Sequence, residues 1–234
     1  MSKQVEFISG PGITITPDAV NRTLTFAANA SVLLDTTPIT LTVAVENLQA
    51  AIDALPKLLM KDVIINVQSG AADVTINIGY FCGTGSIQII GGSVSVRAFM
   101  IEYNTLLRIE ISKFNIVGSN EYDCSVSVYY NTSLIKLAEC NAVFTGNYGV
   151  FATNTPHLHV YGCTFSKKVY AITALSGNIY VDFVDGANNT CVFSAIYGGV
   201  IFLTHTHYSI TGDSIKHTLE GGRIFEGEQV ECWE

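Results

Sequence analysis

The sequence predicts an all-β fold, a parallel β-helix of about seven rungs. An aliphatic residue, a mostly polar residue and a second aliphatic residue recur in that order, which is the alternation expected of a strand with one face in a core. The motif returns at steps of 22, 22, 26, 23, 21 and 22 residues, as a coil of stacked strands requires. Its first aliphatic positions are Ile65, Ile87, Ile109, Ile135, Leu158, Ile179 and Ile201.

The residue types distinguish this repeat from other solenoids. A leucine-rich repeat would show leucines with asparagine or cysteine in register, whereas these positions mix Ile, Val and Leu. Helical repeats are longer, and β-branched residues suit strands. Glycines such as Gly91 and Gly177 fall between the expected strands, where sharp corners need conformations that glycine adopts easily. We therefore expect three short strands and three turns in each rung.

The composition excludes several classes of function. Of 234 residues, 14% are charged, and the formal net charge is −8 with four arginines. A nucleic-acid-binding protein would show a basic stripe, so we expect no nucleic-acid partner. No segment approaches the roughly 18 consecutive apolar residues of a membrane-spanning helix, and no apolar signal segment follows Met1. We expect no membrane insertion, and synthesis in a cytoplasm without a signal peptide.

The six cysteines do not form a zinc-binding pattern, because none belongs to a C-x-x-C pair. Cys140 and Cys163 are one rung step apart, so we expect them to stack in neighbouring rungs. A disulfide between them is geometrically conceivable. We favour buried free thiols, since cytosolic synthesis disfavours bridges and buried thiols behave as small hydrophobic groups.

The chain divides into four expected segments. Residues 1–41 contain two short alternating stretches and predict a β-hairpin that serves for attachment. Residues 42–60 have aliphatic residues at helical spacing before Pro56 and predict a helix that caps the coil. Residues 61–216 form the β-helix. Residues 217–234 leave the register and predict a C-terminal cap or a tail that contacts another subunit.

Three segments together resemble the opening of many phage and prophage tail proteins. Residues 45–57 read VENLQAAIDALPK, residues 63–70 read VIINVQSG, and residues 87–92 read IQIIGG. Residues 9–16, SGPGITIT, and residues 221–225, GGRIF, are similar to other short motifs of such proteins. The chain departs from the pattern after Gly70, where the usual tyrosine is missing.

The resemblance implies a right-handed, pectate-lyase-like β-helix in a tail fibre or tailspike, located in the virion tail. It also implies a homotrimer, contacts with other tail proteins, and recognition of a host surface polysaccharide. Its motifs are structural, so they indicate little about chemistry. No cofactor is expected.

Carboxylates are the first candidates for chemistry, because glycoside hydrolysis needs two of them on either side of a sugar. The outward candidates are Glu110, Glu139, Asp182 and Asp185, with Glu121 and Asp123 on the expected bulge. Their offsets from the anchors differ, so they do not form one column on a single face. We interpret them as surface charges and keep catalysis as the alternative.

Histidines and tyrosines are candidates for binding. Two histidine pairs with a spacing of two lie on one strand face each and could hold a metal in a trimer, although surface histidines are the simpler interpretation. These are His157, His159, His205 and His207. Exposed tyrosines suit a sugar groove or a subunit interface, because the ring is apolar and the hydroxyl is polar. The candidates are Tyr161, Tyr180 and Tyr197, although interior stacking or packing between subunits is the favoured interpretation of these rings.

The favoured function is a structural and host-recognition component of a phage or prophage tail that binds a cell-surface glycan or a partner tail protein. The first alternative is a depolymerase, a glycoside hydrolase or lyase, on the same fold. The second is a bacterial surface adhesin. The residues between the paired aliphatics change from polar to aromatic along the chain, which favours the C-terminal half as the contact surface.

Overall fold

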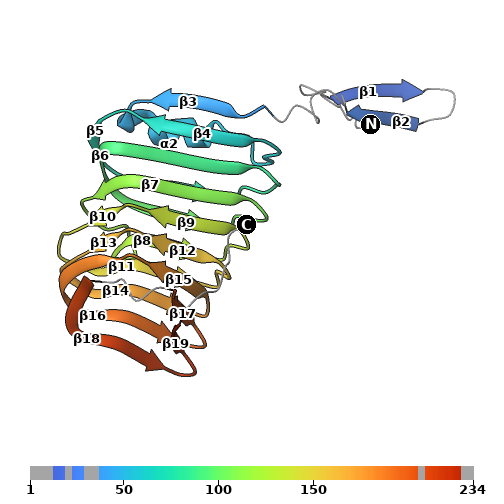
Figure 1. The fold of residues 1–234 in the computed structure, drawn as a ribbon. Coiled ribbons are helices and arrows are strands. Elements are labelled where there is room, and N and C mark those ends of the chain that lie inside the picture. Colours follow the sequence, from blue (N-terminus) through green and yellow to red (C-terminus); the bar gives the residue numbers. More distant parts are fainter. Residues whose placement is uncertain (1–12, 19–22, 29–36, 205–208, 228–234) are drawn as a thin grey trace, which may run out of the picture. The chain divides into compact units, whose positions relative to one another are not determined.

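The structure, a computed structural model, describes residues 13–18, 23–28, 37–204 and 209–227. The chain separates into two units, residues 1–38 and residues 39–234. In the first unit, β1 (Ile13–Asp18) and β2 (Thr23–Ala28) pair as an antiparallel hairpin, as predicted. The second unit is a parallel β-solenoid of about eight turns, which confirms the predicted fold class (Figure 1).

The strands of the solenoid form three faces, which we call A, B and C in the order in which the chain visits them. Nine described strands or strand segments stack on face A. They are β3 (Ile39–Val43), β4 (Asp62–Val67), the first parts of β6 (Ser86–Glu102) and β7 (Arg108–Ile116), β9 (Leu134–Ala138), β12 (Leu158–Tyr161), β15 (Asn178–Asp182), β17 (Val200–Leu203) and β19 (Arg223–Glu226).

Faces B and C take the other strands. Face B contains the start of β5 (Gly70–Gly79), the middle of β6, the end of β7, the short strands β10 (Asn141–Ala142) and β13 (Thr164–Phe165), and the starts of β16 (Asp185–Ile196) and β18 (Ser209–Leu219). Face C contains the ends of β5 and β6, then β8 (Cys124–Tyr129), β11 (Gly146–Thr153) and β14 (Lys168–Leu175), and the remainder of β16 and β18.

The predicted register is right for six of the seven anchors and wrong for the first. Val63, not Ile65, pairs with Ile87. Val63 and Ile65 are both fully buried, so the in-out-in pattern is consistent with either of them as the anchor and does not distinguish the two registers. The same column continues past both predicted ends of the coil, to Ile39 before the helix and to Ile224 near the C-terminus.

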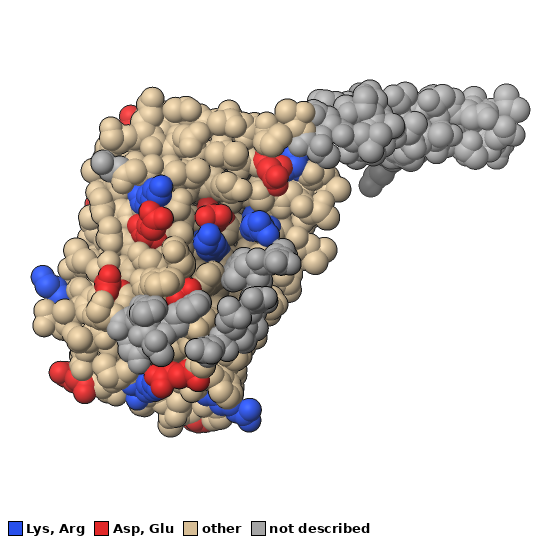
Figure 2. Space-filling model, viewed as in Figure 1, with Lys and Arg blue, Asp and Glu red and all other residues tan. Residues whose placement is uncertain are grey.

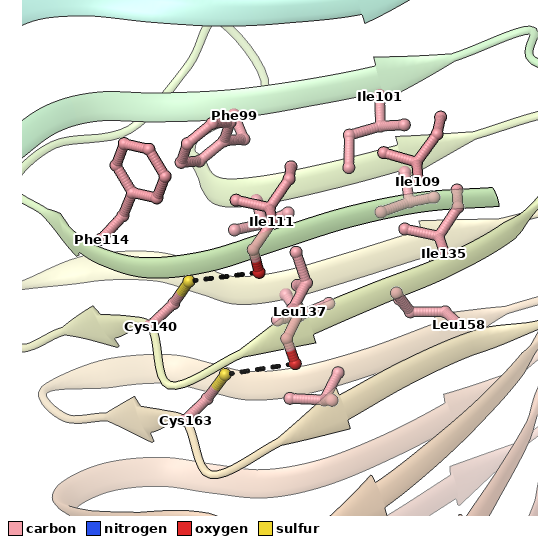
Figure 3. Close-up of a cluster of buried hydrophobic side chains, with 14 of the residues drawn as sticks. Phe99, Ile101, Ile109, Ile111, Phe114, Ile135, Leu137, Cys140, Leu158 and Cys163 are labelled. Carbon is pink, nitrogen blue, oxygen red and sulfur yellow. Dashed lines mark hydrogen bonds between the residues drawn. The ribbon is translucent and has the colours of Figure 1, made fainter. Parts of the chain in front are cut away.

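The core is a continuous stack of side chains from the three faces (Figure 3). Cys140 and Cys163 lie in successive turns, as predicted, because the next residues along their strands pair directly. The five described cysteines are free thiols. The Cys140 thiol donates to the Ile111 carbonyl at 3.8 Å and the Cys163 thiol to that of Leu137 at 3.7 Å, so these thiols fill core positions with their hydrogens satisfied.

The N-terminal end of the solenoid is closed by a helical segment shorter than predicted. It comprises the 3₁₀ turn η1 (Val45–Asn47) and α2 (Leu48–Asp53), rather than residues 42–60. The prediction was too long because residues 39–43 pair with β4 as a strand, and because Pro56 disfavours helix just before it. Leu48 and Ile52 are buried against the first turn.

One side chain of α2 also completes the edge of face C. The Gln49 amide donates to the Asn77 carbonyl at 3.1 Å, and its oxygen accepts from the Asn77 N–H at 2.7 Å. These are the two bonds that a preceding strand would make with β5. The cap therefore covers the core and also satisfies part of an exposed strand edge.

The C-terminal end is closed differently. Lys216 of β18 pairs in register with Phe193, and Glu226 of β19 pairs with Leu203, so both occupy columns that belong to the core in the preceding turn. The Lys216 Nζ lies 2.6 Å from Glu226 Oε1. This ion pair joins faces C and A across the last turn and places charge where a further turn would need apolar residues.

Candidate functional site

The outward column of face A contains several of the predicted residues. Its side chains alternate with the core residues and stack from strand to strand. From β6 to β19 the column is Gln88, Glu110, Lys136, His159, Tyr180, Phe202 and Phe225. The change from polar to aromatic noted in the sequence is therefore a change along one continuous surface.

The charged part of this column is neutralised by its own members. Lys136 Nζ lies 3.4 Å from Glu110 Oε1, one turn apart. The same ammonium stands 5.9 Å from the ring centroid of Tyr161, at the outer limit of a cation–π contact. On the face shown in Figure 2, acidic and basic side chains are interspersed on a mostly uncharged surface.

The aromatic part begins at β12. The rings of Tyr180 and Phe202 stack at 4.8 Å between centroids, and those of Phe202 and Phe225 at 5.4 Å. His157 stacks on Tyr180 at 6.3 Å. Tyr180 is 8% exposed although it belongs to the outward column, so its ring is a support for its neighbours more than a free surface.

Tyr161 lies beside this stack. Its ring contacts His159 edge-on at 6.1 Å between centroids and Phe183 at 5.6 Å. Tyr161 and Phe183 are both exposed. The contacts with Phe183 and His159 hold the Tyr161 ring in place. We use the name aromatic face for the set His157, Tyr161, Tyr180, Phe183, Phe202 and Phe225.

Tyr197 lies apart from the other two predicted tyrosines. It follows the end of β16, at the corner between faces C and A, with a φ of +50°. The structure therefore brings Tyr161 and Tyr180 together on face A and places Tyr197 at its opposite edge. The rung step alone could not show this, because the three tyrosines hold different offsets within their turns.

The predicted metal ligands are only partly described. His157 and His159 both lie on face A, whereas His205 and His207 fall outside the described residues. Burial, with a smaller effect of the Lys136 charge, lowers the pKa of His159 to about 4, so its ring is neutral at physiological pH. Within the described ranges, no three His, Cys, Asp or Glu side chains are grouped so that they could hold a metal ion.

The four predicted carboxylates do not converge. Glu110 and Asp182 are on face A but three strands apart, and Glu139 is at the corner with a φ of +54°. Glu139 faces Lys113 at 4.0 Å, and Asp185, at the start of β16, accepts a hydrogen bond from Ser209. Acid catalysis on a sugar needs two carboxylates across one bond, whereas Glu110 and Asp182 are separated by two intervening strands of face A.

A second aromatic group, on the outer side of face C, was missed by the sequence reasoning. Its five rings form an unbroken chain with centroid separations of 5.0 to 5.9 Å. The members are Tyr122, Tyr129, Phe151, Tyr148 and Tyr170. The 22-residue spacing of Tyr148 and Tyr170 equals the rung step and could have indicated that these rings stack.

The loop that carries Tyr122 is fixed on this face by one asparagine. The side-chain oxygen of Asn120 accepts from the N–H groups of Tyr122 and Cys124, and its Nδ2 donates to Ser127 Oγ at 2.6 Å. The extra residues of the longest step, which the sequence predicts to bulge outward, thus form a turn held by Asn120. The Glu121 charge is the main cause that raises the pKa of Tyr122.

Three further tyrosines stack at the corner between faces C and A. The rings of Tyr80, Tyr103 and Tyr130 lie 5.2 and 5.4 Å apart, and each residue has a positive φ. Behind them, the buried amide of Asn104 accepts from the Phe81 N–H and donates to Asn131 Oδ1. This ladder of amides holds the left-handed corners in register, which explains why bulky residues occupy them.

Comparison of the chain with models of known protein families, with curated proteins and with solved structures found no match. Within the part of the chain that the structure describes, no helix has the length and apolar character needed to cross a membrane. The assignment of function therefore depends on the surfaces described above and on the short motifs of the sequence.

Proposed function

We propose that this protein is a structural and host-recognition component of a phage or prophage tail, and that its aromatic face binds a cell-surface glycan. The supporting observation is the stack of outward aromatic rings on successive strands of face A. Aromatic rings contact the apolar C–H faces of sugars, and nearby polar groups fix the orientation of a ligand. A parallel solenoid repeats these contacts along its axis, which suits a polymer.

Two exposed rings are the expected contact points. Tyr161 and Phe183 can be changed without opening the core, because both side chains are exposed and on the outer surface. The two rings contact each other, with 5.6 Å between their centroids. The phage origin itself is supported by the short motifs at residues 45–57 and 63–70, and the homotrimer by the same resemblance.

The test is binding to a panel of immobilised bacterial capsule and wall polysaccharides. Tyr161→Ser and Phe183→Ser should each weaken binding by about tenfold, the effect of losing roughly 1.4 kcal/mol of ring contact. Tyr197→Ser is the control, since Tyr197 is more exposed than either residue but lies at the opposite edge of face A. Equal losses in all three variants, or no binding by the unchanged protein, would contradict the proposal.

The same incubations address the depolymerase alternative, through the release of reducing ends or unsaturated sugars. Light scattering after size exclusion tests the oligomer. A trimer is expected, and a clean monomer of 25.2 kDa would refute it.

A further inference from the structure

We propose that a hollow at the corner between faces B and C binds one acidic sugar unit, with the ammonium of Lys168 meeting the sugar carboxylate. The hollow has a volume of about 370 Å³. Its lining includes Asp123, Thr145, Asn147, Lys168, Asn188 and Thr190. This site is distinct from the aromatic face, and the proposal holds whether or not that face binds a glycan.

The buried ammonium of Lys168 is the first observation that supports this binding site. The residue is 1% exposed, yet its ammonium makes one hydrogen bond, to the Phe144 carbonyl at 2.7 Å, and stands 3.3 Å from the centroid of the Phe144 ring. An ammonium has three N–H donors, and a buried donor without an acceptor is costly. Burial lowers the pKa of Lys168 to about 8, so the group is still mostly cationic at neutral pH.

Gly146 is the second reason, because at this position no side chain stands between the ammonium and the hollow that both residues line. A Cβ at Gly146 would lie 3.1 Å from Cε2 of Phe144 and 3.6 Å from Nζ of Lys168. Any side chain there would stand over the ammonium and in contact with the ring. The glycine thus makes room beside a buried cation, at the wall of a hollow that contains both residues.

The polar lining is the third reason. Asp123 is fixed by Ser119, whose hydroxyl donates to Oδ1 at 3.2 Å, and by Asn147, whose Nδ2 donates to Oδ2 at 2.5 Å. Amides and hydroxyls from neighbouring turns surround it and offer both donors and acceptors to sugar hydroxyls. The volume of the hollow, about 370 Å³, falls within the range of small-ligand pockets.

The charges favour an acidic sugar over a neutral one. Lys167 and Lys168 both line the hollow, against the single carboxylate of Asp123, which already accepts two hydrogen bonds. The stacked rings of Tyr148 and Tyr170 directly follow the lining residues Asn147 and Val169 in the chain.

The experiment is calorimetric titration of the full chain with a galacturonic acid trisaccharide, with its methyl ester and with inorganic phosphate. The acid should bind, and the ester should bind at least about tenfold more weakly, because a charge-assisted hydrogen bond contributes roughly that factor. Phosphate should compete only poorly. Equal affinity for acid and ester, or phosphate binding as tight as the sugar, would overturn the proposal.

Variants locate the site. Lys168→Met and Gly146→Ala should each reduce binding of the acid by at least about tenfold, the first by removing the cation and the second by covering it. Tyr197→Ser, at the corner between faces C and A and outside both proposed sites, should leave it unchanged. Gly146→Ala keeps the test decisive if Lys168→Met fails to fold, and unaltered binding by a folded Gly146→Ala or Lys168→Met variant would overturn the assignment.

Discussion

The two ends of the solenoid differ in the residues that lie over the open core and the unpaired strand edges. The N-terminal end buries Leu48 and Ile52 of a helix against the first turn and uses the Gln49 amide as a substitute for a missing strand. The C-terminal end instead replaces core residues by Lys216 and Glu226, which pair across the last turn. We expect both arrangements to oppose the stacking of coils end to end, to which open solenoid ends are prone.

The difference lies in what each end contributes. An apolar cap lowers the free energy of the folded chain, because it removes hydrophobic surface from water. A half-exposed ion pair adds little stability, but its charges make a further apolar contact unfavourable. The N-terminal end should therefore determine how stable the coil is, and the C-terminal end should determine whether it associates.

The largest expected effect is the loss of the apolar cap. Leu48→Asp should lower the free energy of unfolding by about 3–5 kcal/mol, because it removes a fully buried side chain and introduces an unpaired charge. Chemical denaturation measures the change. Ala50→Asp is the matched control, since Ala50 is exposed on the same helix, and it should cost about 0.5 kcal/mol or less. Similar losses in the two variants would remove the distinction between cap and surface.

Acid should weaken the C-terminal half before the N-terminal half. His159 of β12 titrates near 6.5 when unfolded, and burial lowers its pKa to about 4 in the folded chain. Above pH 6.5 the residue is neutral in both states. As pH falls from 6.5 to 4, the unfolded chain binds the proton first, so the free energy of unfolding falls by about 3 kcal/mol at most.

Hydrogen exchange at pH 7 and pH 5 tests this order. Amides of β12 and β15 should lose protection at the lower pH, while those of β4 and β5 keep theirs. In His159→Gln the difference between the halves should shrink markedly. Uniform loss of protection along the coil would show that His159 does not control it.

Much of the fold could be predicted, because the core imposes a period that the sequence repeats. Six of the seven anchors are right for this reason. The first is wrong because the run from Val63 to Ile65 is aliphatic throughout, so two registers bury equally suitable residues. The two additional strands of face A, β3 and β19, were missed because each is short and lies next to a segment of different character.

The outer surface was harder to predict, since outward residues need not repeat. Tyr161 and Tyr180 lie on neighbouring strands of face A, but the site at Lys168 was not expected. In the sequence Lys168 resembles any surface lysine. Only the turn before it, which supplies Phe144 and Gly146, makes it a buried cation beside a hollow.

A smaller effect is expected for the edge of face C. Gln49→Ala removes two hydrogen bonds to the backbone of Asn77 and should cost about 1 kcal/mol, because water can reach this edge and replace part of what is lost. Denaturation of the variant measures it. A loss comparable to that of Leu48→Asp would mean that satisfying the edge, and not covering the core, is the main task of the cap.

The smallest change in stability, but the clearest change in association, is expected at the C-terminal end of the solenoid. Replacing Lys216 and Glu226 together by leucine should alter the free energy of unfolding by about 1 kcal/mol or less, since exposed ion pairs contribute little. The last turn would then present leucines in the columns of Phe193 and Leu203, as an internal turn does. Light scattering at increasing concentration should show assemblies larger than those of the unchanged protein. Arginine and aspartate at the same positions preserve the charges and should preserve the original size. If the leucine variant keeps that size as well, the polar residues of the last turn are not what prevents association, and the contrast between the two ends reduces to the helix alone.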